Sequence, residues 1–270
     1  MKKINPYYKE YINIEETHIR LKTDIENNKL KNFIYKTRED LKNYIEINPY
    51  FKTSLEKVNI NNSNNNFDKN NNDYKNLNFL NYESNSKNKF PEIIRLMCES
   101  SNISETGPMA SVAGSISELS LNYLIKKGTK YSIIENGGDI ALINNKKLIC
   151  GIYSNNKILK NRIGFKIKEN KKPIGICTSS GKIGHSISFG DSESVTVISN
   201  SASISDGLAT RIANDVCGNN SEDSVINALE TCEKYKDYLK GVLIISGESI
   251  GRFGKLPKII ETPDFKQNII

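Results

Sequence analysis

The stretch from residue 131 to residue 200 alternates between apolar and polar side chains and is interrupted by turn residues. Within it, "YSIIENGGDIALINNKKLICGIY" (131–153) predicts strands around two turns, "RIGFKIKENKKPIGICTSSG" (162–181) predicts a hairpin, and "ESVTVISN" (193–200) predicts a further strand. Strands joined by short turns pair antiparallel, whereas parallel neighbours require a long crossover. The pattern therefore favours an α+β architecture with antiparallel sheets over a doubly wound parallel sheet.

Helical spacing of apolar residues appears on both sides of this stretch. The segment 107–128 has small residues through its first half, so either another element or a ligand is expected to lie close against its backbone. The predicted helices lie within residues 37–51, 90–102, 107–128, 203–215 and 221–239, and further strands are predicted at 17–24 and 241–254.

The 270 residues are enough for one large domain, which we predict to span residues 1–270. An Asn-rich tract at residues 59–90 interrupts it, and such polar side chains cannot offset the entropy that is lost when a chain is ordered. We predict a disordered surface insertion there. The alternative is a weak hairpin around "DYKNLNFLNY" (73–82).

The chain carries a formal net charge of +7, from 38 Lys and Arg against 31 Asp and Glu. Its lysines are scattered, which is typical of a solvated surface and would also help to attract an anionic ligand. We expect no nucleic-acid binding, because the sequence has neither an Arg cluster nor aromatic residues interleaved with a basic stripe. Without an apolar run long enough for a signal peptide or a membrane span, the sequence predicts a cytoplasmic protein with no membrane partner.

Asp206 and Thr210 lie four residues apart in the helix predicted at 203–215, so their side chains face the same side. A carboxylate and a hydroxyl are hard oxygen donors that suit Mg²⁺ or Ca²⁺. The alternative is structural: Asp206 would cap its own helix, and Thr210 would bond back to a helix carbonyl.

Two glycine-containing segments are further candidates for a site. The turn "ENGGDI" (135–140) would let backbone N–H groups face phosphate oxygens, although hairpins use the same residues for shape alone. The loop "CTSSGKIGHSISFG" (177–190) combines Cys177, several hydroxyls and His185. It would place an acid–base imidazole beside a polar ligand, whereas the alternative is a merely exposed histidine.

Taken in order, the helix "GPMASVAG", the turn "ENGGDI", the loop "GICTSSGKIGHSISFG" and the helix "DGLAT" resemble the motifs of the ApbE superfamily. The likeness is greatest to a cytoplasmic branch found in archaea and anaerobic bacteria, whose members carry "GPMAAVAG"-like, "VENGGDI"-like and "ADAAAT"-like motifs. It covers most of the chain apart from the Asn-rich insertion.

The resemblance implies a T-fold-like α+β structure that binds FAD and Mg²⁺. ApbE proteins transfer FMN from FAD onto a Thr or Ser of an acceptor protein through a phosphoester bond. By the same resemblance, Asp206 and Thr210 are expected to bind the metal, and His185 is expected to be the general base. The residues expected to bind the flavin nucleotide are Gly107, Met109, Ala110, Gly114, Glu135, Asn136, Gly137, Gly138, Asp139, Thr178, Ser179, Ser180 and Gly181.

Two departures from the transferase motifs leave three functional hypotheses. "HSISF" replaces an "HIIDP"-like segment, so an acidic partner is missing, and Ala113 stands where the transferases have Lys. The first hypothesis is a Mg²⁺-dependent flavin transferase that uses His185 and an acceptor protein. The second is a module that holds FAD, FMN or a related nucleotide without transfer. The third is a sulfur-handling protein of sulfur assimilation toward homocysteine, with Cys177 as thiol carrier. A homodimer is also expected.

Overall fold

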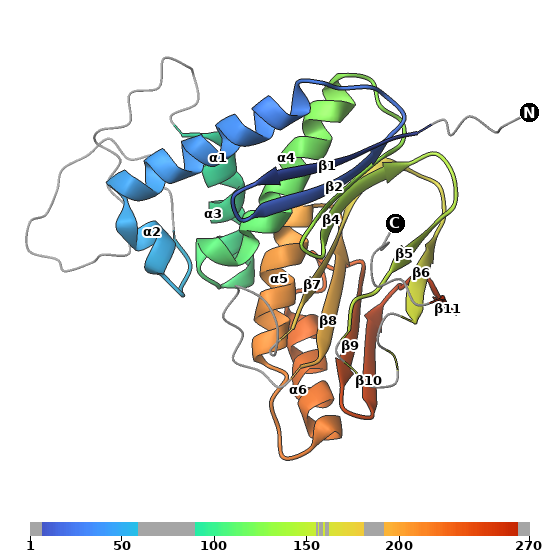
Figure 1. Ribbon diagram of the computed structural model, residues 1–270. Helices are drawn as coiled ribbons and strands as arrows, with labels where there is room; N and C mark the ends of the chain where they lie inside the picture. The colour runs from blue at the N-terminus through green and yellow to red at the C-terminus, as the bar shows by residue number, and fades with distance from the viewer. Residues whose placement is uncertain are drawn as a thin grey trace, which may run out of the picture.

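A computed structural model describes most of the chain outside the Asn-rich tract (Figure 1). The predicted insertion, apart from Phe90, lies outside the described residues. These are residues 7–58, 90–154, 156, 159, 162–180 and 192–263.

Most helices and strands follow one another as the sequence patterns predict, but two strands are additional: one before the strand expected at 17–24 and one after the pair expected at 241–254. The helices are α1 (Leu30–Ile47), α2 (Pro49–Thr53), α3 (Glu92–Ser104), the 3₁₀ helix η1 (Pro108–Ser111), α4 (Val112–Lys126), α5 (Ala202–Asn214) and α6 (Ser221–Lys234). The strands are β1 (Tyr8–Ile14), β2 (Thr17–Thr23), β3 (Ser132–Asn136), β4 (Asp139–Asn144), β5 (Leu148–Gly151), β6 (Ile163–Ile167), β7 (Asn170–Ser179), β8 (Ser194–Ser199), β9 (Gly241–Ser246), β10 (Ser249–Gly254) and β11 (Lys258–Glu261).

The described strands form two antiparallel sheets. Eight of them make one sheet in the order β1-β2-β3-β4-β7-β8-β9-β10, and β11-β6-β5 make a smaller one. The predicted α+β class with antiparallel sheets is confirmed. The hairpin predicted at 162–181 is wrong, because β6 pairs with β5 and β11 while β7 pairs with β4 and β8. Consecutive strands can join different sheets when each buries its apolar face better there.

The large sheet lies between the helices and the small sheet (Figure 1). Successive side chains of a strand point to opposite faces. Accordingly, Ile134 on β3 and Ala141 on β4 pack among the residues of the helices, whereas Ile133 and Ile140 belong to the apolar cluster that includes the small sheet. Strands β3, β4 and β8 are buried on both faces, which explains why the apolar–polar alternation in their sequences is incomplete.

Backbones approach one another very closely where α4, α5 and β7 meet. A Cβ on Gly114 of α4 would lie 2.4 Å from the carbonyl oxygen of Ala202, and a Cβ on Gly175 of β7 would lie 2.4 Å from the Cα of Ala202. Both distances are far below a normal contact, so only glycine fits at these two positions. The expectation that another element lies against the small-residue helix is therefore confirmed, and that element is α5.

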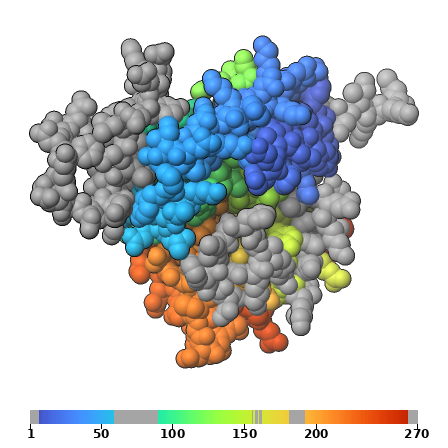
Figure 2. All heavy atoms as spheres, turned by 60° about the vertical axis from the view of Figure 1, so that its left-hand side comes forward, coloured from blue at the N-terminus to red at the C-terminus, as the bar shows by residue number. Residues whose placement is uncertain are grey.

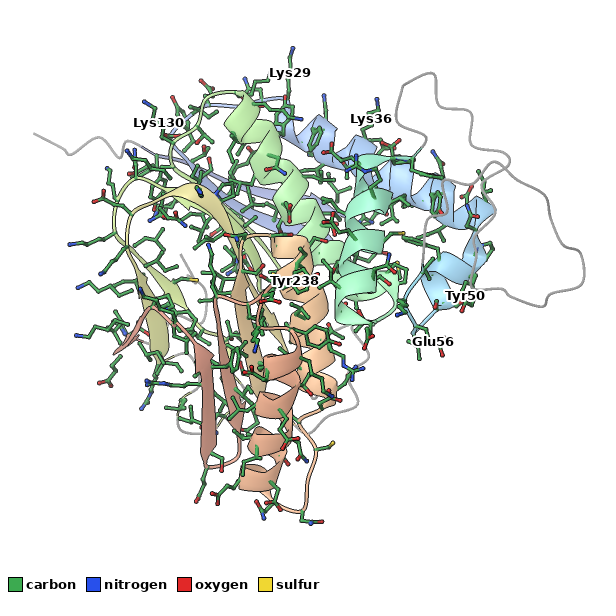
Figure 3. All side chains as sticks on the ribbon, turned by 180° about the vertical axis from the view of Figure 1, so that it is seen from behind. Lys29, Lys36, Tyr50, Glu56, Lys130 and Tyr238 are labelled. Carbon is green, nitrogen blue, oxygen red and sulfur yellow. The ribbon has the colours of Figure 1, made fainter. Side chains whose placement is uncertain are left out.

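The N-terminal strands and α1 lie side by side over the upper part of the surface seen in Figure 2. Arg38 of α1 joins them, because its guanidinium forms ion pairs with Glu15 and Glu16 in the β1–β2 turn. Lys29, Lys36 and Lys130 are exposed and point away from the fold (Figure 3). In the described part of the chain, no helix has the length and apolar character that crossing a membrane requires.

We expect Gly114→Ala to destabilise the protein by about 2 kcal/mol. In a helix interior Ala is normally more stable than Gly by about 1 kcal/mol. The sign of the change in the free energy of unfolding therefore shows whether the steric contact with Ala202 outweighs this helix preference. Urea unfolding followed by circular dichroism measures the change. Glu230→Ala, on the exposed face of α6, is the control and should stay within about 0.5 kcal/mol of the wild type. A stabilised Gly114→Ala variant would contradict the close approach.

Candidate functional site

The turn between β3 and β4 lies at the end of the large sheet where β7 ends and β8 begins. Asn136 pairs with Asp139 across it, and Gly137 and Gly138 have φ angles of +65° and +107°. Left-handed backbone of this kind strains any residue with a Cβ, so glycine is required in the two-residue turn. No atom of the described residues lies within 4 Å of where a Cβ would be on either glycine, so the turn presents an open backbone surface.

A buried carboxylate holds this turn in shape. Glu135 accepts a hydrogen bond from the backbone N–H of Gly138 at 2.8 Å, and its other oxygen lies 3.6 Å from Nε of Arg20 on β2. Burial raises the pKa of Glu135, while the Gly138 N–H and Arg20 lower it. Glu135 was predicted to contact a nucleotide, but in this structure both of its oxygens face protein groups, which gives it a positioning role.

The neighbouring amide of Asn136 ties the turn to the rest of the fold. Its Oδ1 accepts a hydrogen bond from the backbone N–H of His18 at 3.2 Å, and its Nδ2 donates to the carbonyl of Ala113 on α4 at 3.4 Å. Asn136, also a predicted nucleotide contact, is thus engaged by β2 and α4. The sequence could not indicate this, because both partners are distant along the chain.

Asp206 caps a helix, but not its own. Its Oδ2 accepts the backbone N–H of Gly114 at 2.8 Å, and that N–H belongs to the first turn of α4, where helical N–H groups lack intrahelical partners. The N-cap of α5 is Ser201, whose hydroxyl accepts the N–H of Ile204 at 3.2 Å. The alternative in which Asp206 caps its own helix is therefore wrong.

Asp139 joins Asp206 in a pair of buried carboxyls. Its Oδ1 is buried and has no hydrogen-bond partner in the described part of the chain. Burial, followed by the charge of Asp206, raises the pKa of Asp139 well above its ordinary value of 3.8. Burial also raises the pKa of Asp206 to about 7, an effect that the Gly114 N–H partly offsets. Two acids held in this way repel each other when both are ionised, which a cation would relieve.

Thr210 lies one turn beyond Asp206 on α5 and is also buried. Its hydroxyl makes no hydrogen bond within the described residues, so no back-bond to a helix carbonyl occupies it. The donors gathered here are two carboxyls and a hydroxyl, which are hard oxygen ligands that fit Mg²⁺ with waters completing the shell. Among the described residues no group of three or more His, Cys, Asp and Glu is placed to hold a metal, so this part of the chain would supply few of the ligands.

The thiol of Cys177 is fully buried beside these acids. It donates to the carbonyl oxygen of Ala202 at 3.2 Å, and burial, then Asp139 and Asp206, raise its pKa well above the ordinary value. A thiol kept protonated and out of solvent is a poor nucleophile. The structure therefore contradicts the role of thiol carrier expected for Cys177 and gives it a packing role.

The remaining predicted residues divide between packing and the sheet end. Gly107 is packed so closely that a Cβ would lie 1.9 Å from the carbonyl oxygen of Ser54, whereas Met109 and Ala110 of η1 are half-buried. Thr178 is hydrogen-bonded across the strands to Thr196 at 3.0 Å. The other members are Ser179 and Ser180, which are buried at the end of β7, and Gly181 and His185, which lie outside the described residues.

Comparison with protein families and curated proteins agrees with these motifs. The family model described as "AbpE bacteria" matches residues 11–237. A UPF0280 protein of Methanobrevibacter smithii is 54% identical over 256 residues, which cover 95% of this chain and 97% of the relative. A UPF0280 protein of Methanothermobacter thermautotrophicus is 41% identical over 253 residues, covering 94% and 88% of the two chains.

Among solved structures, the fold is similar to that of the Pseudomonas stutzeri flavinyl transferase ApbE in its apo form. The superposition has a TM-score of 0.53 and covers 99% of this chain and 98% of the other, with 11% sequence identity. At that identity the likeness concerns the arrangement of helices and strands, which it shares over nearly the whole length.

We expect the acid pair to make stability fall as pH rises. The raised carboxyl pKa values mean that the folded state keeps protons that the unfolded chain loses above its ordinary pKa of 3.8. From there to about pH 7 or beyond, the pair's contribution to the free energy of unfolding decreases with pH. Asp139→Asn removes one charge, and should raise the melting temperature at pH 8 and flatten this dependence.

Urea unfolding between pH 5 and pH 8 measures how the free energy of unfolding depends on pH, and thermal unfolding at pH 8 measures the melting temperature. Both are carried out in the presence of a chelator. Asp237→Asn is the matched control, because Asp237 is exposed and the same substitution there should leave the slope unchanged. An Asp139→Asn variant with the wild-type slope and no gain in stability at pH 8 would show that the two acids are not coupled.

Proposed function

The chain belongs to the family described as AbpE bacteria, and we propose that it binds FAD together with a divalent cation at the Asp139–Asp206 pair. The observation that supports this most is the unpartnered, buried Oδ1 of Asp139 beside Asp206. A protein tolerates two desolvated acids with an unfilled hydrogen-bonding capacity chiefly where a ligand completes the site.

The glycine turn supports the nucleotide half of this proposal. Gly137 and Gly138 present backbone without side chains next to Asp139, which lets a pyrophosphate approach closely. Three acids lie at this end of the sheet: Glu135, Asp139 and Asp206. Of these, only Glu135 forms an ion pair with a described residue, which is Arg20. An anionic dinucleotide would be repelled by these acids unless a cation binds with it.

We further propose that the bound FAD is a substrate for flavin transfer, the activity named for the structurally similar ApbE. An acceptor hydroxyl oxygen would form a bond to the phosphorus on the FMN side, the bond to the AMP phosphate would break, and AMP would leave. When bound, a divalent cation supplies charge neutralisation at the pyrophosphate oxygens. Asp206 and Thr210 would orient that cation, and His185, outside the described residues, would take the hydroxyl proton.

Asp206→Asn should weaken Mg²⁺-dependent FAD binding by about tenfold or more, because an amide keeps the bond from Gly114 but loses the negative charge. Quenching of flavin fluorescence on titration with the protein, with Mg²⁺ or with a chelator, measures this. Asp237→Asn should bind like the wild type. Equal FAD affinity with and without Mg²⁺ would overturn the proposed role of the cation.

His185→Ala should retain FAD binding but abolish transfer, because the acceptor hydroxyl would lose its base. Mass spectrometry of a Thr-containing acceptor peptide, together with measurement of released AMP, detects the reaction. His18→Ala is the matched control, since His18 is the other histidine and, within the described part of the chain, its ring hydrogen-bonds only to Asn13. If the wild-type protein binds FAD but releases no AMP, the protein holds the nucleotide without transfer.

A further inference from the structure

A cavity lies on the helix side of the large sheet, and neither Asp139 nor Asp206 lines it. It has a volume of about 380 Å³, is lined by α4, β4, β7 and the residues around the start of α5, and opens to solvent. Its apolar walls include the buried residues Leu121 of α4, Ala141 of β4 and Ala202 of α5. Ile174 of β7 also borders it, although the Ile174 side chain packs in the apolar cluster that includes the small sheet. Small-molecule pockets are typically about 300–1,000 Å³ with mainly apolar walls, so this cavity has the size and floor of a ligand site.

One side of the cavity carries a lysine that has no ion-pair partner among the described residues. Lys172 of β7 lines it and forms no ion pair with any described acidic side chain. Lys240 lies close enough that the charge of Lys172 adds to burial in lowering the pKa of Lys240. An ammonium group on the cavity wall with no ion-pair partner among the described residues favours a carboxylate on the ligand.

The opposite wall carries a carboxylate that is only half used. Glu118 of α4 accepts the hydroxyl of Ser201 at 2.6 Å and the backbone N–H of Ser203 at 3.0 Å, and both bonds go to Oε2. Its Oε1 makes no hydrogen bond within the described residues. A ligand that was only an anion would be repelled from this side, whereas an ammonium group would be attracted to it.

Two amides stand beside these charges. Asn122 follows Glu118 by one turn on α4, and Asn200 precedes α5, and both line the cavity. Neither side chain makes a hydrogen bond within the described part of the chain, so each can donate to a carboxylate or accept from an ammonium group. The polar groups therefore complement a small zwitterion, and the walls complement an aliphatic body.

We propose that this cavity is a binding site for a free α-amino acid with an aliphatic side chain. The ligand carboxylate lies toward Lys172, its ammonium group toward Glu118, and its side chain against Leu121 and Ala141. The site is separate from the proposed FAD site, so either proposal can fail without the other.

The test uses the full chain and L-leucine as the probe, with binding measured by calorimetry and by the shift in melting temperature. We expect saturable binding with a Kd of about 1 mM or tighter. 4-Methylpentanoate, which lacks the ammonium group, and 3-methylbutylamine, which lacks the carboxylate, should each bind at least about tenfold more weakly. Equal binding of 4-methylpentanoate would overturn the role of Glu118, and the absence of saturable leucine binding would overturn the proposal.

Lys172→Gln should weaken leucine binding by about tenfold, whereas Lys171→Gln should not, because Lys171 is equally exposed but does not line the cavity. Asn122→Leu adds bulk inside the cavity without touching the bonds of Glu118 and should also reduce binding. Equal effects of the two lysine substitutions would show that only net charge matters and would overturn the site. FAD titration of the same variants should be unchanged.

Discussion

The contact between the first turn of α4 and the carboxylate of Asp206 on α5 is the constraint on which the rest of the site depends. It forms because Gly114 and Gly175 let the backbone around Ala202 approach both α4 and β7 to distances that exclude a Cβ. One turn farther along α4, Glu118 binds the hydroxyl and N–H groups at the start of α5. Three hydrogen bonds, made by Gly114 and Glu118 on one face of α4, therefore set both the position and the rotation of α5.

This arrangement brings two acids together in the core, which is costly in an apoprotein. Asp206 receives compensation from the Gly114 N–H at a helix N-terminus, whereas Oδ1 of Asp139 receives none in the described part of the chain. The pair is thus asymmetric: Asp206 holds α4 against α5, whereas the Asp139 carboxyl is bonded by the Cys177 thiol and the Thr178 N–H and keeps one oxygen without a partner among the described residues. Glu135, on the same turn but on the opposite face of the strand, shows the contrast, since both of its oxygens face protein groups.

Much of the site could be predicted from local sequence. The two glycines between alternating segments predict the β3–β4 turn, and the spacing of Asp206 and Thr210 predicts one helix face. Local patterns could not show that Asp139 and Asp206 are neighbours, that Asp206 caps α4, or that Cys177 lies behind both. Those relations join residues from α4, β4, β7 and α5, and no local spacing encodes them.

The sequence by itself determined the antiparallel α+β class, most of the order of the elements and the requirement for glycine at 137 and 138, because periodicity and backbone sterics act over a few residues. The requirement for glycine at 114 comes instead from the tertiary contact with Ala202. Only the tertiary structure decided that β5 and β6 form a separate sheet and which acids are buried together. It also decided which of the predicted nucleotide-binding side chains, such as Glu135 and Asn136, bond to other protein groups instead. Burial and pairing depend on which distant surfaces exclude water from each other, and that is settled only when the chain packs.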